Sequence, residues 1–420
     1  MKFNTLGEAQ SWIESVVRFK DKYDLVRMER ACEMLGHPEQ SFKTIHIGGT
    51  NGKGSTLTFL KEILLSANYH VGTFTSPYVV RFNERITLDG KLIADEELLT
   101  YINRIYDFQA EYLEKHGDQI SFFELLTLIS FLYFKDKKVD VVLYEVGLGG
   151  RLDATNVIDP ELAIITSIGH DHMHILGDTL EKVTLEKLGI VKAGTPLASG
   201  VLQETLIPVI NSYTNNINAP VRHLKDFLDE PSTSNAHGTL SFKGDSFKIN
   251  VHGNYQVHNA RLALLASEML NEYTDFTVSL EAMREGLLNM TMPGRFEIMG
   301  NVILDGAHNP EGIYEGVKAL KNYAGDLPVT VLFTVMKDKD YDSMQKSVEA
   351  IAKNIVYTEL PTERSEKAEV LKKKSYHPSV LAFSDYEEAL SNAVDLSKNG
   401  LLYVCGSLYF ISTIRSLLIK

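Results

Sequence analysis

Residues 43–55 read KTIHIGGTNGKGS, and this stretch decides the fold class of the chain. Lys43 to Ile47 is predicted to form a strand, and leucines recur at helical spacing after the glycines, at Leu57, Leu60 and Leu64. A strand, a glycine-rich turn and a helix in this order are the context of a phosphate-binding loop. Small residues there let backbone N–H groups close on phosphate oxygens at a helix N-terminus. The stretch therefore predicts an α/β fold in which a phosphate loop follows a strand of a parallel sheet.

The loop itself is predicted to bind ATP through Thr50, Asn51, Gly52, Lys53, Gly54 and Ser55. Lys53 would neutralise the β- and γ-phosphates, and a hydroxyl of Ser55 or Thr56 would face a magnesium ion. The general pattern G-x-x-x-x-G-K-[ST] differs at two places, since the chain has Ile47 in place of glycine and Gly54 directly after the lysine. A glycine turn that binds no ligand is the alternative, but packing alone hardly explains a lysine beside four glycines.

The rest of the chain extends the α/β pattern. Runs rich in Val, Ile and Leu at 44–47, 71–75, 139–145 and 163–168 alternate with helix-like segments, which predicts βαβ units around a parallel sheet. A second glycine cluster, Gly147 to Gly150, lacks the third glycine of a dinucleotide turn, so nicotinamide binding is not expected.

Two breaks divide the sequence. The polar stretch from about 211 to 250 predicts a peripheral hairpin around Gly244-Asp245. Met292-Pro293-Gly294 then interrupts the chain, and new strands are predicted at 302–304, 329–333, 355–358 and 401–404. We therefore expect a phosphate-loop domain at 1–292, a linker at 293–297 and a smaller α/β domain at 298–420.

Composition limits the function classes. The chain has 420 residues, with 42 Lys+Arg against 55 Asp+Glu and a net charge of −13, which argues against general binding to nucleic acid or to membrane surfaces. Its two cysteines cannot form a disulfide framework, and no apolar run is long enough for a membrane span. We expect a cytoplasmic protein that binds anionic ligands through a local basic site.

Six motifs occur in order along the chain: GGTNGKGST, FTSPYVVRFNERI, EVGLGGRLDATN, SIGHDHMHILGDTLEKVTLEKLGI, PGRFE and LDGAHNPEG. Together they closely resemble the folylpolyglutamate synthase/dihydrofolate synthase family, within the Mur ligase group of ATP-dependent amide-forming ligases. The resemblance implies a phosphate-loop domain followed by a smaller Rossmann-like domain, with ATP and two magnesium sites. The chain departs locally from the family, at Leu188, at His170 and at Tyr255, which stands where histidine is common.

The resemblance also implies a set of magnesium ligands. These are Ser76, Glu145 and His172, together with a carbamate that carbon dioxide forms on Lys187. Glu145 follows a run of apolar residues, and the carboxyl end of a parallel strand is where ligands bind in open α/β sheets. A solvated strand end is the alternative for Glu145. Because His170, His172 and His174 alternate, a zinc site is also an alternative.

The predicted position of Lys187 on its helix independently supports a reactive amine. Asp178 and Glu181 predict a capped helix start, and Lys187 then lies on the apolar stripe with Leu180, Val183, Thr184, Leu188 and Val191. A lysine directed to the interior has its charged form disfavoured, and the neutral amine is the form that reacts with carbon dioxide. The alternative is a lysine that extends along a half-buried helix face to reach water.

Further site residues follow from the resemblance. Asn259 would contact adenine, whereas Arg295 and Asp305 would bind the phosphates and ribose of ATP. His308 would lie near the transferred phosphate or the incoming amino acid, and Ser407 on the glutamate side. Ordinary helix caps and turn residues are the alternatives for these positions. For the pterin and the carboxylates of folate the candidates are Phe122, Phe123, Glu124, Arg81 and Arg85, with an ordinary core helix at 122–124 as the alternative.

The implied reaction joins L-glutamate to the γ-carboxyl of folate, or to dihydropteroate, through an acyl phosphate. A Mur-type ligase acting on a muramyl peptide is one alternative, although only about 45 residues precede the phosphate loop. A phosphate-loop ATPase that acts as a switch or binding module is the other. The residues do not tell whether one or both folate reactions occur, and we expect a monomer.

Overall fold

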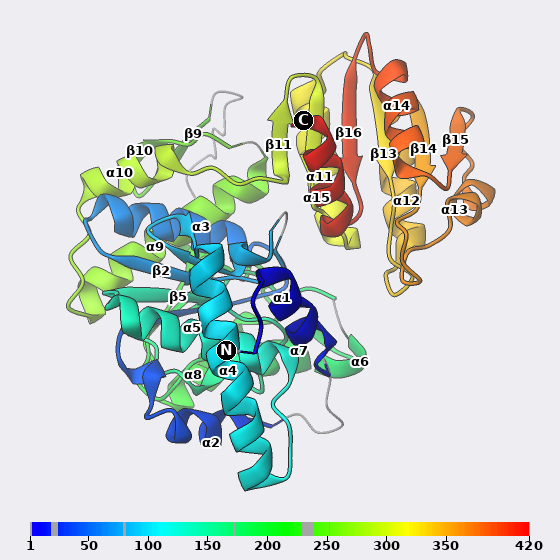
Figure 1. Cartoon of the computed structure of the whole chain (residues 1–420). Coiled ribbons are helices and arrows are strands. Elements are labelled where there is room, and N and C mark those ends of the chain that lie inside the picture. The colour runs from blue at the N-terminus through cyan, green and yellow to red at the C-terminus, as the bar shows by residue number, and fades with distance from the viewer. Residues whose placement is uncertain are drawn as a thin grey trace. The chain divides into compact units, whose positions relative to one another are not determined.

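The computed structural model describes residues 2–17, 24–78, 81–170, 173–228, 238–251 and 253–419. They form two compact units (Figure 1). The first contains the described residues of Met1–Ser232, Ser241–Phe247 and His258–Asn289, and the second contains those of Thr233–Leu240, Lys248–Val257 and Met290–Lys420. Across the described ranges, no helix has the length and apolar character that crossing a membrane requires.

The strands described in the first unit form an eight-stranded sheet in the order β4-β3-β2-β5-β1-β6-β7-β8. Neighbouring strands are parallel along β2-β5-β1-β6-β7-β8. At the other edge, β3 and β4 are antiparallel. The sheet consists of β1 (Lys43–Gly48), β2 (Val71–Phe74), β3 (Ile86–Leu88), β4 (Lys91–Leu92), β5 (Val141–Glu145), β6 (Leu162–Ile165), β7 (Leu197–Ser199) and β8 (Val221–His223).

The helices of this unit pack on the sheet or on one another, and most of them bury apolar side chains there. They are α1 (Leu6–Ser15), α2 (Val26–Met34), α3 (Lys53–Ser66), α4 (Asp95–His116), α5 (Phe122–Lys137), α6 (Met173–Leu176), α7 (Leu180–Leu188), α8 (Ile207–Asn216), α9 (Asn254–Tyr273) and α10 (Leu280–Asn289). Short 3₁₀ turns are η1 (Pro38–Gln40), η2 (Phe82–Arg85), η3 (Ala154–Val157) and η4 (Leu224–Phe227).

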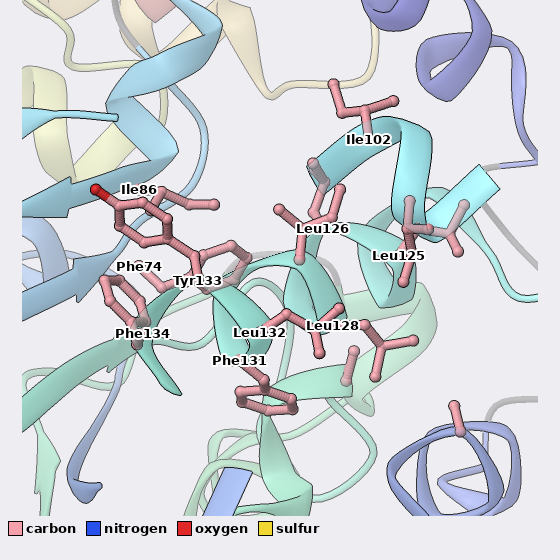
Figure 2. Packing of buried hydrophobic residues seen from close by; sticks show 14 of the residues in the cluster. Phe74, Ile86, Ile102, Leu125, Leu126, Leu128, Phe131, Leu132, Tyr133 and Phe134 are labelled. Carbon is pink, nitrogen blue, oxygen red and sulfur yellow. The ribbon is translucent and has the colours of Figure 1, made fainter. Parts of the chain in front are cut away.

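One core of the first unit lies around α5. Figure 2 shows side chains from along this helix, including Leu125, Leu128 and Phe134, with Phe134 beside Phe74 of β2, and all of them are buried. A second core lies under α7 and α8, against β6 and β7. Burying an aliphatic or aromatic side chain stabilises a fold by roughly 1.5–3 kcal/mol. These cores therefore hold the strand ends, and the loops that follow them, in fixed positions.

The strands described in the second unit form a six-stranded sheet in the order β11-β12-β16-β13-β14-β15, with only β11 antiparallel. Its strands are β11 (Arg295–Met299), β12 (Val302–Asp305), β13 (Val329–Phe333), β14 (Asn354–Thr358), β15 (Val380–Phe383) and β16 (Leu401–Cys405). Its helices are α11 (Pro310–Ala324), α12 (Tyr341–Glu349), α13 (Ala368–Lys374), α14 (Tyr386–Leu396) and α15 (Leu408–Leu418).

This second unit has three layers. Along β16, Leu401, Tyr403 and Cys405 face a core with α11, α12 and α13, whereas Leu402 and Val404 face a core with α14 and α15. Side chains alternate between the faces of a strand, so a strand that is apolar throughout is covered on both faces. The expected α/β fold is confirmed, with two sheets that are parallel except at one edge each.

Several expected elements are shifted or were missed. The hairpin around Gly244 is present as β9 (Thr239–Phe242) and β10 (Asp245–Lys248). The helix that carries Lys187 begins after Thr179, whose hydroxyl accepts from the backbone N–H of Lys182, and not at Asp178. It ends at Leu188, so Val191 lies beyond it. Part of the expected linker is ordered as β11, which makes β12 the second strand of its sheet rather than the first.

Candidate functional site

The phosphate loop lies between β1 and α3 and has a conformation that only glycine tolerates at two positions. Gly49 has φ +145°, and a Cβ there would lie 1.9 Å from the hydroxyl oxygen of Thr166. Gly52, with φ +85°, is the N-cap of α3, so the first N–H groups of this helix open onto the loop. Unpaired N–H groups at a helix N-terminus suit phosphate oxygens. The geometry therefore has the backbone shape that phosphate binding requires.

The segment after β6 holds the phosphate loop in place through hydrogen bonds. The Thr50 N–H donates to the Ser167 carbonyl at 2.9 Å, and the Asn51 N–H donates to the Ser167 hydroxyl at 2.9 Å. In return, the Thr166 hydroxyl donates to the Asn51 carbonyl at 2.6 Å. Since β1 and β6 are neighbours in the sheet, their two end loops brace each other. Thr166 and Ser167 were not anticipated from the sequence.

Two lysine side chains meet at this loop. Lys53 Nζ donates to the Gly49 carbonyl at 3.1 Å and to the Thr50 carbonyl at 3.3 Å. Lys187 Nζ, from α7, donates to the same Gly49 carbonyl at 3.0 Å. Lys187 is only 4% exposed, as its predicted place on the apolar stripe requires. Two lysine amines at a single carbonyl correspond to the local basic site that was expected to bind anionic ligands in a protein of net charge −13.

The residues that were expected to supply oxygen ligands lie at the ends of the neighbouring strands. The sheet order β2-β5-β1 brings Ser76, Glu145 and the phosphate loop to one edge, and Glu145 pairs in register with Ile47. The Ser76 N–H donates to Glu145 Oε2 at 3.1 Å, so the two residues are in contact. The buried Glu145 carboxylate and the Ser76 hydroxyl are both oxygen groups, and oxygen is the ligand type that magnesium prefers.

The third expected ligand, His172, lies outside the described residues, as does Asp171. His170 is described and its side chain is exposed. Within the described ranges, no three His, Cys, Asp or Glu side chains gather closely enough to hold a metal. The zinc alternative therefore stays untested.

The amide of Asn259 lies directly against the phosphate loop. A Cβ on Gly52 would be 2.4 Å from Asn259 Oδ1, and Asn259 is 5% exposed on α9. Near it on the same helix, His258 Nε2 is bonded to the Gly200 carbonyl at 2.9 Å. The expected contact of Asn259 with adenine stays a prediction.

The loop after β5 contains a buried polar chain that sequence reasoning missed. The Thr155 hydroxyl donates to Asp153 Oδ1 at 2.5 Å, so it accepts from His46 Nε2 at 2.7 Å. Burial and the charge of Lys192 lower the pKa of His46 to about 3, and burial raises the pKa of Asp153. The signal available in the sequence was Asp153-Ala-Thr155, because Asp commonly accepts from the N–H two residues on.

In the second unit, Asp305 at the end of β12 is buried. Its Oδ2 accepts from the Tyr403 hydroxyl at 2.8 Å and its Oδ1 accepts from the Ala307 N–H at 3.2 Å. Burial raises the pKa of Asp305, although the Tyr403 hydrogen bond and the charge of Arg295 act against that rise. Arg295 pairs with Asp305 in the register of β11 and β12. Tyr403, the buried partner of Asp305, was not anticipated.

His308 and Ser407 follow neighbouring parallel strands, β12 and β16. His308 Nδ1 donates to the Gly306 carbonyl at 2.9 Å, which leaves Nε2 as the basic nitrogen of the neutral ring. Ser407 is the N-cap of α15 and is 2% exposed. The Gly406 N–H donates to the Ala307 carbonyl at 2.9 Å, so the two loops touch.

The folate candidates have partners within the protein. Glu124 accepts from the Ser121 N–H at 2.7 Å and pairs with Arg27 Nε at 3.0 Å. The Arg85 guanidinium is buried near three aromatic rings, those of Tyr78, Phe82 and Phe122. The other two candidates also have contacts: Arg81 bonds Asp95 at the surface, and Phe123 packs on Phe74. Contact of any of them with folate stays a prediction.

Comparison with known proteins identifies the family. The Mur ligase middle domain matches residues 47–267, and the glutamate ligase domain of Mur ligases matches residues 294–408. A relative from Bacillus subtilis, dihydrofolate synthase/folylpolyglutamate synthase, is 38% identical over 98% of this chain and 99% of its own. The chain belongs to the Mur ligase family.

Solved Mur ligase structures agree in fold over the whole length. The folylpolyglutamate synthase of Thermotoga maritima is 31% identical, with a TM-score of 0.85 over 99% of this chain and 97% of that chain. That of Mycobacterium tuberculosis, solved with ADP and AMPPCP, is 27% identical, with a TM-score of 0.90 over 99% of this chain and 98% of that chain. The resemblance stated from the motifs is thus confirmed. Within the Mur ligase family, the relatives to which this chain is similar are folylpolyglutamate and dihydrofolate synthases.

Proposed function

We propose that this Mur ligase is an ATP-dependent ligase that adds L-glutamate to the γ-carboxyl of a folate. The observation that carries the proposal is the meeting of Lys53 and Lys187 at the Gly49 carbonyl, at the same edge of the sheet as the proposed metal ligands Ser76 and Glu145. The relatives that match almost the entire chain bear the names of this activity.

The phosphate loop would hold ATP through its backbone N–H groups and the Lys53 ammonium. An amide does not form from a carboxylate at neutral pH without activation. The γ-carboxylate of folate would attack the γ-phosphorus, the bond to ADP would break, and an acyl phosphate would form. The amine of L-glutamate would then attack that carbonyl and lose a proton, and phosphate would leave with the electrons of the C–O bond. Lys53 would offset the charge at each stage.

Ser76 and Glu145 are the residues that would hold magnesium, since they supply a hydroxyl and a buried carboxylate, and the Ser76 backbone N–H is hydrogen-bonded to that carboxylate. A bound magnesium ion supplies charge neutralisation of phosphate oxygens. His172 remains a proposed third ligand. The arrangement has only oxygen donors among its described members, which favours magnesium over zinc.

The carbamate on Lys187 is also a proposal. It is supported by the burial of this side chain, because burial disfavours the charged amine, and the neutral amine is the nucleophile that would attack carbon dioxide and then lose a proton. Carbamylation would convert a cation beside the phosphate loop into an anion, which could help hold a second magnesium ion.

Arg295 and Asp305 are proposed to bind ATP, and His308 and Ser407 to serve the glutamate side. His308 Nε2 is the basic nitrogen of its ring and could accept the proton that the glutamate amine loses. A Mur-type peptide ligase and a non-ligase ATPase are not favoured, because the matched relatives are named as folate ligases over nearly their full length. That the chain acts as a monomer in the cytoplasm stays a prediction.

The test is incubation of the protein with ATP, magnesium and L-glutamate, separately with tetrahydrofolate and with dihydropteroate. ADP release and product mass are followed, with and without added bicarbonate. We expect one glutamate to be added to tetrahydrofolate per ADP formed, and bicarbonate to raise the rate if the carbamate forms. Addition to dihydropteroate as well would make the enzyme bifunctional. ATP hydrolysis with no gain of mass on either acceptor would contradict the proposal.

A further inference from the structure

We propose that Asn156 is a positioning residue that sets where the Lys187 amine lies against the phosphate loop. The inference rests on the proposed function, in which Lys187 takes part. Asn156 lies in η3, in the segment that follows β5, and among the described residues it makes no hydrogen bond to the loop between β1 and α3. It acts through the last turn of α7.

The side chain of Asn156 joins two segments that are far apart in the sequence. Its Nδ2 donates to the Arg151 carbonyl at 2.9 Å and to the Gly189 carbonyl at 3.0 Å. Gly189 is the C-cap of α7, two residues after Lys187. The backbone carbonyl of Asn156 accepts from Lys192 Nζ at 2.9 Å, on the same far segment. Asn156 is 3% exposed, so water cannot replace these bonds without opening the structure.

The backbone of the segment after β5 is in close contact with the backbone at the end of α7, so neither can shift without the other. The Arg151 N–H donates to the Glu186 carbonyl at 2.8 Å. A Cβ on Gly150 would lie 2.8 Å from the carbonyl oxygens of both Glu186 and Lys187. A Cβ on Gly189 would lie 2.4 Å from the Cβ of Arg151. A shift of the segment around Asn156 must therefore move the turn that contains Lys187.

The segment around Asn156 is itself fixed. Asp153, the N-cap of η3, accepts from the N–H and the hydroxyl of Thr155, and also from the Leu148 N–H at 2.8 Å. These bonds are buried, and buried satisfied networks specify one arrangement. A chain of contacts thus leads from Asp153 to Asn156 and from Asn156 to the end of α7. From there the Lys187 side chain reaches the Gly49 carbonyl.

The substitution that tests this is Asn156→Asp, which keeps the size of the side chain but replaces both N–H donors with an oxygen that repels the two carbonyls. The matched control is Asn103→Asp. Asn103 is also 3% exposed, and its Nδ2 also donates to two carbonyls, those of Phe3 and Leu99 at 3.1 Å. Asn103 holds the N-terminal segment rather than α7, so its loss should destabilise the fold and leave the phosphate loop unaffected.

The measurement is the dissociation constant of AMPPCP by calorimetry, for the wild type, Asn156→Asp, Lys187→Met and the double variant. We expect Asn156→Asp to weaken binding by about tenfold and the double variant to bind no more weakly than Lys187→Met alone, because effects on one path do not add. Asn103→Asp is expected to lower the thermal midpoint with unchanged affinity. Because AMPPCP binding needs neither folate nor glutamate, this result is independent of whether the ligase reaction is assigned correctly.

Unchanged affinity in Asn156→Asp would overturn the proposal, and so would a double variant whose loss equals the product of the two single losses. If Asn156→Asp does not fold, Gly150→Ala takes its place, because its Cβ would press directly on the Glu186 and Lys187 carbonyls. The same weakening and the same lack of additivity with Lys187→Met are expected for that variant, and their absence counts equally against the proposal.

Discussion

His46 illustrates how strongly one buried residue can depend on its surroundings. Its side chain is fully buried on β1, with Nε2 bonded to Thr155. Burial and the charge of Lys192 lower its pKa from 6.5 to about 3, so the ring stays neutral in the folded protein. In the unfolded chain the same ring takes up a proton near pH 6.5. The stability that the neutral ring contributes is therefore complete above pH 6.5 and is lost as the pH falls toward 3.

A pH prediction follows for the first unit. Between pH 7.5 and pH 5.5, His46 should lower the free energy of unfolding by about 1.4 kcal/mol, because only the unfolded state binds the proton. The measurement is urea unfolding at both pH values for the wild type and His46→Gln, since a glutamine can still donate to Thr155 but does not titrate. The wild type should lose about 1.4 kcal/mol more than the variant. Equal losses in the two proteins would show that His46 titrates normally.

At the scale of the element, the phosphate-loop turn combines backbone strain with a close contact. Gly52 has a positive φ, and a Cβ there would also strike the Asn259 amide at 2.4 Å. Gly36 has φ +71°, but a Cβ there would have nothing within 4 Å. Both glycines therefore have a positive φ, but only at Gly52 would an added Cβ meet another residue.

Gly52→Ala and Gly36→Ala therefore separate these effects. Each should lower the free energy of unfolding by about 1–2 kcal/mol, the usual cost of a left-handed residue with a side chain. Only Gly52→Ala should also weaken AMPPCP binding, by about tenfold or more, because the new methyl group displaces Asn259 and disturbs the N-terminus of α3. Calorimetric titration of both variants checks this. Equal affinities for the two variants would mean that the contact with Asn259 does not matter for the nucleotide.

The sequence predicted β1, β2, β5 and β6 of the first sheet and β12, β13, β14 and β16 of the second, because they are short, continuous apolar runs between turns. It did not predict the outer strands β3, β4, β7, β8 and β15. It missed β11, whose pattern is broken where Phe296 has φ +53° and the pairing with β12 shifts register. It also placed the cap of α7 one residue early, since Asp178 and Thr179 can both cap a helix. Lys53 and Lys187 were located by local pattern, helped by the family motifs. The contacts of Asn156 and Tyr403 depend on long-range packing, which no local pattern reveals.

For the whole molecule, the division into two units has consequences for unfolding. Each unit has its own buried cores. The only tryptophan is Trp12, in the first unit, where it packs on Phe3 and Tyr106. Tryptophan fluorescence therefore reports the first unit, whereas far-UV circular dichroism reports the helices of both.

We expect the urea unfolding curves from these two probes to differ in midpoint, because domains with separate cores need not unfold together. AMPPCP should shift the fluorescence curve to higher urea, since the phosphate loop lies in the first unit. Two curves that coincide at every urea concentration, with and without AMPPCP, would instead show a single cooperative transition.

Each unit also contains one buried cysteine, Cys32 in the core of the first and Cys405 in the core of the second. Burial raises the pKa of both thiols, so in the folded state neither is present as the thiolate that reacts with alkylating reagents. A thiol reagent can reach either residue only after its own core opens. The rates at which the two sulfurs gain label thus time the opening of each unit in the unaltered chain, and a cysteine introduced at the surface would carry a dye at one chosen place.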